Sequence, residues 1–146
     1  MSIYWFTGQP ASGKTTLANN LLTHFGKENT IIIDGDNLRD IFQNKDYSEV
    51  GRRKNIERAQ DIAQFLHKKG FTVLVSLVSP YKDQREDFKK REGGVVEVYV
   101  HTTEDRGRNQ FHVENYEPPT ENFIDLDTTD KTETDSYYEI LKKLTL

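Results

Sequence analysis

The chain has 146 residues, with 24 acidic residues against 20 lysines and arginines and a formal net charge of −4. Its length fits one domain over residues 1–146, large enough to bury a single core. The lack of cysteine excludes disulfide scaffolds and cysteine-based metal sites. The negative charge argues against broad nucleic-acid binding, and no apolar run is long enough to cross a membrane. The first residues lack the features of a signal peptide, so we expect a cytoplasmic protein without nucleic-acid or membrane partners.

Strand-forming segments alternate with helical ones along the chain. The expected strands are residues 3–6, 30–33, 71–78, 95–100 and 123–126. The expected helices are residues 14–25, 52–69 and 81–91, followed by a last helix whose buried stripe is Tyr137, Ile140, Leu141 and Leu144. This alternation predicts a parallel five-stranded sheet with helices on both faces, which is a three-layer α/β/α fold. Right-handed crossovers place the C-terminal ends of the strands along one edge, where ligands of such sheets bind.

The segment after the first strand predicts a phosphate-binding loop. Residues 8–15 read Gly-Gln-Pro-Ala-Ser-Gly-Lys-Thr and fit the pattern G-x-x-x-x-G-K-[ST] between a strand and a helix. In this motif the lysine bridges the outer phosphates and the Thr15 hydroxyl coordinates Mg²⁺. The alternative, a turn that only caps a helix, is disfavoured because spacing, lysine and context agree. The sequence therefore predicts a P-loop NTPase-type fold that binds a nucleoside triphosphate through Gly8, Ala11, Ser12, Gly13, Lys14, Thr15 and Thr16.

Two carboxylates follow the second strand, in Asp34-Gly35-Asp36, on the same edge of the sheet. One can contribute to a Mg²⁺ site while the other accepts a proton from an attacking hydroxyl. The alternative is a structural role, in which these residues form a turn and Asp36 caps a helix. A GTPase is disfavoured, because Asn44-Lys45-Asp46 is one residue short of N-K-x-D and follows no strand. A nucleotide-dependent kinase is the better interpretation.

Segments beyond the phosphate loop resemble the adenylylsulfate (APS) kinase family. Residues 33–39, Ile-Asp-Gly-Asp-Asn-Leu-Arg, are similar to the family's L-D-G-D-N-x-R, and residues 73–81 to its V-L-V-S-x-I-S-P-Y. Further similarities lie at Tyr47-Ser48-Glu49, Arg52, Asn55-Ile56, Arg58, residues 96–100 and residues 116–119. The resemblance covers nearly the whole chain in the right order.

This resemblance implies that the γ-phosphate of ATP is transferred to the 3′-hydroxyl of APS in the presence of Mg²⁺. Asp36 is then the general base, Lys14 stabilises the phosphoryl group that is transferred, and Thr15 and Asp34 hold the metal ion. The implied contacts to APS come from Asp34, Asp36, Arg39, Tyr47, Arg52, Asn55 and Ser79. Members of the family are commonly dimers, so a homodimer is implied as well.

The chain departs from the family pattern around the implied acceptor site. Gly51 and Lys54 stand where the family has acidic residues, so two acids are lost. The segment between Arg39 and Tyr47 is also one residue shorter than in typical members, which leaves its local register open.

A second departure lies between the fourth and fifth strands, where the family has a longer lid over ATP. Here we expect only a short lid within residues 101–118. Arg106 is the candidate in it to close over the β- and γ-phosphates. The alternative is a compact surface loop with solvated arginines.

Two alternatives to an APS kinase stay open. The chain can be a kinase of the same fold that acts on another small hydroxyl compound, such as a nucleoside, a sugar acid or an antibiotic. It can also be a nucleotide-binding protein whose shortened lid has weakened or abolished catalysis. Whether the product serves sulfate assimilation or the sulfation of a metabolite is left open too.

Overall fold

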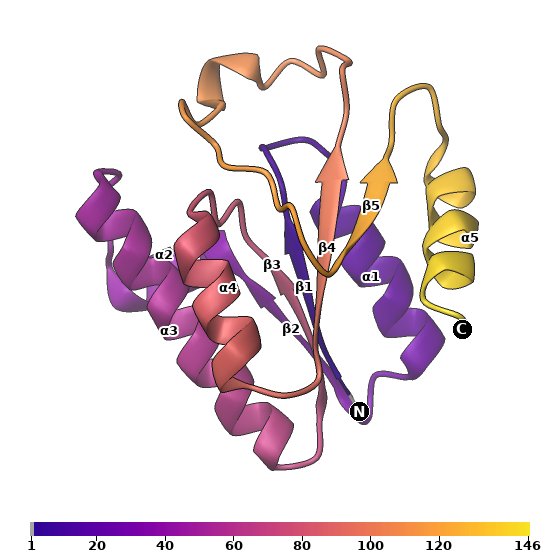
Figure 1. The fold of residues 1–146 in the computed structure, drawn as a ribbon, viewed down its shortest axis with the longest axis horizontal. Helices are drawn as coiled ribbons and strands as arrows, with labels where there is room; N and C mark the ends of the chain where they lie inside the picture. The colour runs from indigo at the N-terminus through magenta and orange to yellow at the C-terminus, as the bar shows by residue number, and fades with distance from the viewer. Residues whose placement is uncertain (1) are drawn as a thin grey trace.

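The computed structural model describes residues 2–146, and a parallel five-stranded sheet lies at its centre (Figure 1). The strands are β1 (Ile3–Thr7), β2 (Thr30–Asp34), β3 (Thr72–Ser76), β4 (Val95–His101) and β5 (Phe123–Asp127). Their order across the sheet is β2-β3-β1-β4-β5, and every neighbouring pair is parallel. The central strand β1 is buried along its whole length, which suits its run of aromatic and β-branched residues.

Helices cover both faces of the sheet (Figure 1). On one face lie α2 (Gly35–Phe42), α3 (Glu49–Lys68) and α4 (Lys82–Arg91), and on the other α1 (Lys14–Phe25) and α5 (Glu133–Lys143). The alternation along β1 separates the two cores, because Ile3 and Trp5 pack under the first group and Tyr4 and Phe6 under the second. No helix within residues 2–146 has both the length and the apolar character that a membrane span needs.

The expected elements are confirmed in kind and order, and the main differences concern β3 and α2. Strand β3 ends at Ser76 rather than at Val78, because Ser79 adopts a positive φ of 41° that turns the chain away from the sheet. Helix α2 was not predicted, since its first residues read as a turn. It forms because the Asp34 side chain accepts a hydrogen bond from the Asp36 amide at 2.8 Å, so the residue that caps α2 is Asp34 and not Asp36.

A buried ion pair fixes the return of the chain from the short lid towards β5. Arg85 on α4 and Glu97 on β4 lie 2.7 Å apart, with side chains only 2% and 1% exposed. The guanidinium of Arg85 also donates to the carbonyl oxygens of Ser79 at 2.6 Å and Glu117 at 2.5 Å. One side chain thereby connects the turn after β3 to the end of the lid.

Glu117 and Tyr116 add further connections at the same place. The Glu117 carboxylate accepts a hydrogen bond from the Lys82 amide at 2.8 Å, which caps α4, and the Tyr116 hydroxyl lies 2.7 Å from that of Thr7. The end of the lid is therefore anchored to α4 and to the last residue of β1, directly before the phosphate loop.

We expect Arg85→Met to lower the free energy of unfolding by about 3–5 kcal/mol, because it leaves buried carbonyls without a donor and removes one partner of a buried carboxylate. Urea titration followed by circular dichroism measures this change. Arg53→Met is the matched control, since its pair with Asp83 is partly exposed, and we expect it to cost about 0–1 kcal/mol. Equal effects of the two substitutions would contradict a special role for the buried pair.

Candidate active site

The phosphate loop joins the end of β1 to the start of α1, as its sequence predicted. Gly8 has a φ of +152°, and a side chain there would collide with the carbonyl oxygen of Val100. Gly13 precedes the first turn of α1 with a φ of +113° and provides no side-chain cap. The first amides of the helix therefore have no acceptor within the helix or from its cap. They form an anion-binding surface, to which the helix dipole adds positive potential.

Two side chains hold the loop from behind through its carbonyl groups. Arg106 donates to the carbonyl oxygens of Ala11 and Ser12 at 3.1 and 3.2 Å, and Thr128 Oγ1 donates to that of Ser12 at 2.8 Å. In a trans peptide the C=O and the following N–H point in opposite directions. Because the Ser12 carbonyl is held outward, the Gly13 amide faces the inside of the loop.

This contact changes the interpretation of Arg106. The sequence offered it as a candidate lid cation over the β- and γ-phosphates, with a solvated surface arginine as the alternative. In the structure its nitrogens bond to the carbonyls of the loop and of Thr128, and to the Glu104 carboxylate at 3.0 Å. It supports the loop and does not extend over it.

Lys14 lies in the loop with its side chain nearly buried. Its ammonium donates to the carbonyl oxygen of Gln9 at 2.9 Å, and only 8% of the residue is exposed. Burial lowers the pKa of Lys14 to about 8; the charges of Asp34 and Asp36 act in the opposite direction, and that of Arg108 lowers it further. Both carboxylates after β2 and one arginine of the lid therefore contribute to the electrostatic environment of the lysine.

Oxygen ligands for a hard cation gather beside the lysine. The hydroxyls of Thr15 and Ser76 are 3.2 Å apart, and Asp34 lies beside Ser76 in the register of β2 and β3. Within residues 2–146 no three histidine or carboxylate side chains gather as a metal cage. A donor set of hydroxyls and one carboxylate fits Mg²⁺, which keeps most of its shell for water and phosphate oxygens.

Asp34 and Asp36 stand at the start of α2, on the edge that carries the phosphate loop. Asp34 uses one carboxylate oxygen to cap the helix, while the Asp36 side chain is exposed. Asn55, which is buried in α3, donates to the carbonyl oxygen of Gly35 at 3.3 Å. Asn55 therefore holds the start of α2 in place, and its own Oδ1 is buried without a partner among the described residues.

The two arginines expected at the acceptor differ in their surroundings. Arg39 donates from one nitrogen to the carbonyl oxygens of Asn44 and Asp46 at 3.2 and 3.1 Å, and its guanidinium lies 4.0 Å from the centre of the Tyr47 ring. It thus organises the loop between α2 and α3. Arg52 is half-buried and its side chain has no hydrogen bond or ion pair to the rest of chain 2–146.

Gly51 explains how this shorter loop fits. A side chain at Gly51 would collide with Asp46, and the Gly51 carbonyl accepts a hydrogen bond from the Asn44 side chain at 2.9 Å. The loss of the family's acidic residue at this position therefore accompanies the shorter loop, which packs directly on α3.

Ser79 and Tyr47, which the resemblance implies as contacts to APS, both have partners within the protein. Ser79 is 2% exposed, and its hydroxyl accepts from the Trp5 indole at 2.8 Å and donates to the carbonyl of Leu77 at 3.1 Å. Its role is to fix the turn after β3 in the core. Tyr47 is 62% exposed and stacks on Arg39 at the rim.

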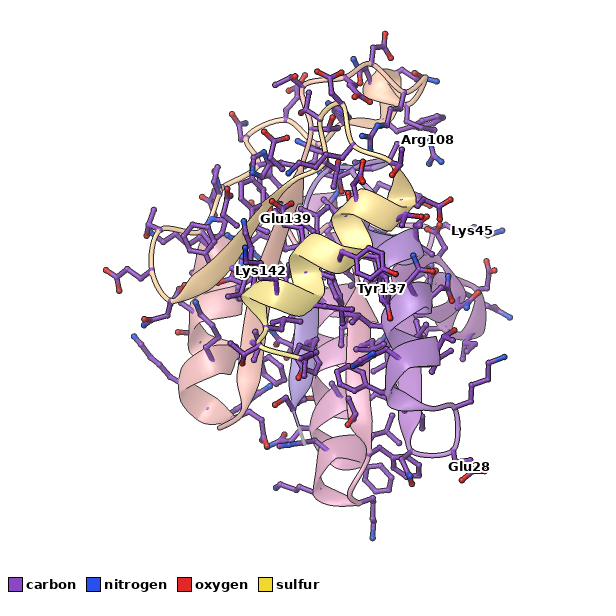
Figure 2. The ribbon with its side chains drawn as sticks, turned by 90° about the vertical axis from the view of Figure 1, so that its right-hand side faces the viewer. Glu28, Lys45, Arg108, Tyr137, Glu139 and Lys142 are labelled. Carbon is purple, nitrogen blue, oxygen red and sulfur yellow. The ribbon has the colours of Figure 1, made fainter. Side chains whose placement is uncertain are left out.

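The short lid crosses the end of the sheet above the phosphate loop (Figure 1). Its residues between His101 and Tyr116 contain one turn of 3₁₀ helix, Asn109–Phe111. The Gln9 side chain donates a hydrogen bond to the carbonyl oxygen of Val113 in the lid at 2.9 Å and accepts one from the Val113 amide at 2.8 Å. In Figure 2 Arg108 lies at the end of the molecule opposite Glu28, which follows α1, and hence at the end where α1 begins.

Sequence reasoning missed Gln9, Ser76 and Thr128 as parts of this site. Gln9 occupies a variable position of the phosphate-loop pattern, so the motif gave it no weight. Ser76 is a polar residue at the end of an apolar strand, which was a usable signal, since strand ends face the ligand edge. Thr128 gave no local signal.

Comparison with known proteins gives a consistent result. A family model described as Adenylylsulphate kinase matches residues 1–126. The chain is 36% identical over 103 residues to an adenylyl-sulfate kinase of Burkholderia ambifaria, covering 67% of this chain and 57% of that protein. It is 36% identical over 106 residues to the bifunctional enzyme NodQ of Rhizobium meliloti, covering 69% of this chain and 16% of the relative. The chain thus spans only part of the length of these relatives.

The fold is similar to a solved structure over almost the whole length of both chains. The Mycobacterium tuberculosis APS kinase CysC, solved in complex with AMPPNP and APS, superimposes with a TM-score of 0.84. The match covers 99% of this chain and 98% of that one at 23% sequence identity, so it supports the P-loop α/β/α fold predicted from the sequence.

The lowered pKa of Lys14 predicts how stability depends on pH. Below pH 8 the ammonium is charged in the folded and the unfolded chain, so its burial costs stability in full. Between pH 8 and 10.5 the unfolded chain binds more protons than the folded one, so this cost falls as pH rises.

We therefore expect Lys14→Met to be more stable than the natural chain by up to about 3 kcal/mol at pH 7. The difference should narrow by about 2 kcal/mol at pH 9.5. Urea unfolding of both proteins at several pH values measures this difference in free energy of unfolding. The contributions of groups that titrate in both proteins cancel in the difference. A constant difference over this range would show that Lys14 is not desolvated.

Proposed function

This chain belongs to the adenylylsulphate kinase family, and on that premise we propose that it transfers the γ-phosphoryl group of ATP to the 3′-hydroxyl of APS. The products are 3′-phosphoadenylylsulfate and ADP. The observation that carries the proposal is the meeting of three groups at one sheet edge: the open amides of the phosphate loop, Lys14, and the carboxylates of Asp34 and Asp36. The solved Mycobacterium tuberculosis relative binds AMPPNP and APS, which supports the same pair of ligands here.

Phosphoryl transfer requires in-line positioning and neutralisation of the negative charge that spreads over the phosphoryl oxygens. The amides at the start of α1 bind the β-phosphate, and Lys14 exchanges its hydrogen bond with the Gln9 carbonyl for phosphate oxygens. Thr15, Ser76 and Asp34 are the residues that would hold Mg²⁺, which supplies further positive charge when bound.

Asp36 acts at the acceptor. Its side chain is exposed, and it is free of the capping role that Asp34 fulfils. It accepts the proton of the 3′-hydroxyl as the oxygen forms its bond to the γ-phosphorus, and the bond between that phosphorus and the bridging oxygen breaks to release ADP. Arg52 is available for the anionic part of APS, and the planar fork of a guanidinium fits phosphate and sulfate oxygens.

A coupled assay of ADP release, with purified protein, Mg-ATP and APS, tests the proposal directly. A nucleoside, a sugar acid and an aminoglycoside serve as competing acceptors in the same assay. Transfer to another alcohol with none to APS would show that the protein is a kinase but that its acceptor is not APS. Tight ATP binding without transfer to any acceptor would favour a nucleotide-binding protein without kinase activity. The homodimer implied by the resemblance stays a prediction.

We expect Asp36→Asn to lower kcat by about 10²–10⁴, because the hydroxyl loses its proton acceptor. ATP binding, measured by calorimetry, should change little, since the loop amides and Lys14 are untouched. Asp40→Asn, an equal change of charge at an exposed position of the same helix, is the control and should keep kcat. Normal turnover in Asp36→Asn would mean that another group takes the proton.

Arg52→Ala should raise KM for APS about tenfold or more and leave KM for ATP nearly unchanged, because the lost guanidinium is a charged partner of the acceptor alone. Steady-state kinetics with each substrate varied in turn measures the two constants. Lys54→Ala, an exposed basic residue on the same helix, is the control for general charge effects. An equal rise in both KM values would remove Arg52 from the acceptor site.

A further inference from the structure

The side chain of Gln9 forms a two-point contact with the main chain of the lid. Its amide nitrogen donates to the carbonyl oxygen of Val113 at 2.9 Å, and its carbonyl oxygen accepts from the amide of Val113 at 2.8 Å. A primary amide is the group that can satisfy both polar groups of one residue in this way. The contact joins positions 104 residues apart in the chain.

Gln9 is also part of the phosphate loop itself. Its main-chain carbonyl accepts the hydrogen bond of the Lys14 ammonium at 2.9 Å. One residue therefore contacts the lysine of the loop through its main chain and the lid through its side chain. Any displacement of the lid at Val113 pulls on the segment that positions Lys14.

The other end of the lid rests on the same loop. Arg106 bonds to the carbonyl oxygens of Ala11 and Ser12, as described above. The lid is thus docked on the phosphate loop at two places, and Arg108 lies between them in the chain, with its guanidinium over the Phe111 ring. This part of the lid lies above the phosphate loop (Figure 1).

Few other contacts fix residues 107–112 to the rest of the protein. Phe111 is 57% exposed, and residues 107–112 are all exposed, so no apolar core fixes the lid. A segment of this kind opens locally at low cost unless specific polar contacts close it. The two hydrogen bonds of Gln9 are the contacts that do so between the 3₁₀ turn and the anchored residues Tyr116 and Glu117.

We propose that Gln9 is a positioning residue that docks the short lid on the phosphate loop and so keeps water away from the phosphoryl group during transfer. The proposal rests on the proposed kinase function, and it assigns to one side chain the closure that a longer lid would otherwise provide. Closure of this kind directs the phosphoryl group to the acceptor hydroxyl rather than to water.

The test separates docking from chemistry. Gln9→Met keeps the length of the side chain and loses both hydrogen bonds. Val113→Pro removes the lid amide that donates to Gln9, and the extended ψ of 138° at His112 is one that a residue before proline adopts. Gln110→Ala removes an exposed glutamine of the lid and is the matched control.

Docking is measured in the protein with AMPPNP and Mg²⁺ as the rate of tryptic cleavage after Arg106 and Arg108, followed by mass spectrometry. Two lost hydrogen bonds shift an opening equilibrium by about tenfold or more, so we expect Gln9→Met to be cleaved at least about tenfold faster than the natural chain. Val113→Pro should be cleaved faster too, and the double variant no faster than Gln9→Met, since both changes remove the same contact. Gln110→Ala should match the natural chain.

Water exclusion is measured as ATP hydrolysis without acceptor, divided by transfer to APS. Gln9→Met should raise this ratio and lower kcat more than it raises KM for ATP. The proposal would be overturned if Gln9→Met had the same cleavage rate and the same ratio of hydrolysis to transfer as Gln110→Ala. This comparison is made with variants whose thermal unfolding matches that of the natural chain. Because cleavage is read without an acceptor, failure of the natural chain to phosphorylate APS would refute the proposed function and still leave the docking result decisive.

Discussion

The amides at the start of α1 have no acceptor within their own helix, and the rest of the site is arranged around this constraint. Buried amides need partners, and a ring of them beside a helix N-terminus favours an anion. Arg106 and Thr128 bond to the carbonyls on the outer side of the loop, which leaves the amides as the groups that face its inside. The burial of Lys14 follows from the same arrangement, because its ammonium is positioned beside the amides that bind the anion.

The fold could be predicted from the sequence because its signals are local. The apolar period of residues 14–25 and the apolar centre of β3 each reflect the layer in which the element is buried. Helix α2 was missed for an equally physical reason. It has eight residues, begins with glycine and depends on a cap from Asp34 outside it, so the pattern of a turn and that of a capped helix coincide.

The site was predictable only where its chemistry is local. The phosphate loop and the two carboxylates lie within short motifs, and the family resemblance aligned them. Contacts between distant segments were not accessible, such as those of Gln9 with Val113 and of Arg85 with Glu117. Ser79 shows the converse, because a residue in a conspicuous motif is used inside the core, where it accepts the hydrogen bond of a buried indole.

The anchoring of Tyr116 and Glu117 makes the preceding segment a closed loop with two fixed ends, one at the end of β4 and the other beside β1. The entropy of closing such a loop grows only with the logarithm of its length, at about 0.6 kcal/mol for each doubling. Lengthening or shortening this segment therefore leaves the sheet and its anchors almost unaffected. Families with this architecture can vary the covering over the nucleotide as a separate module, while the surface beneath it stays the same.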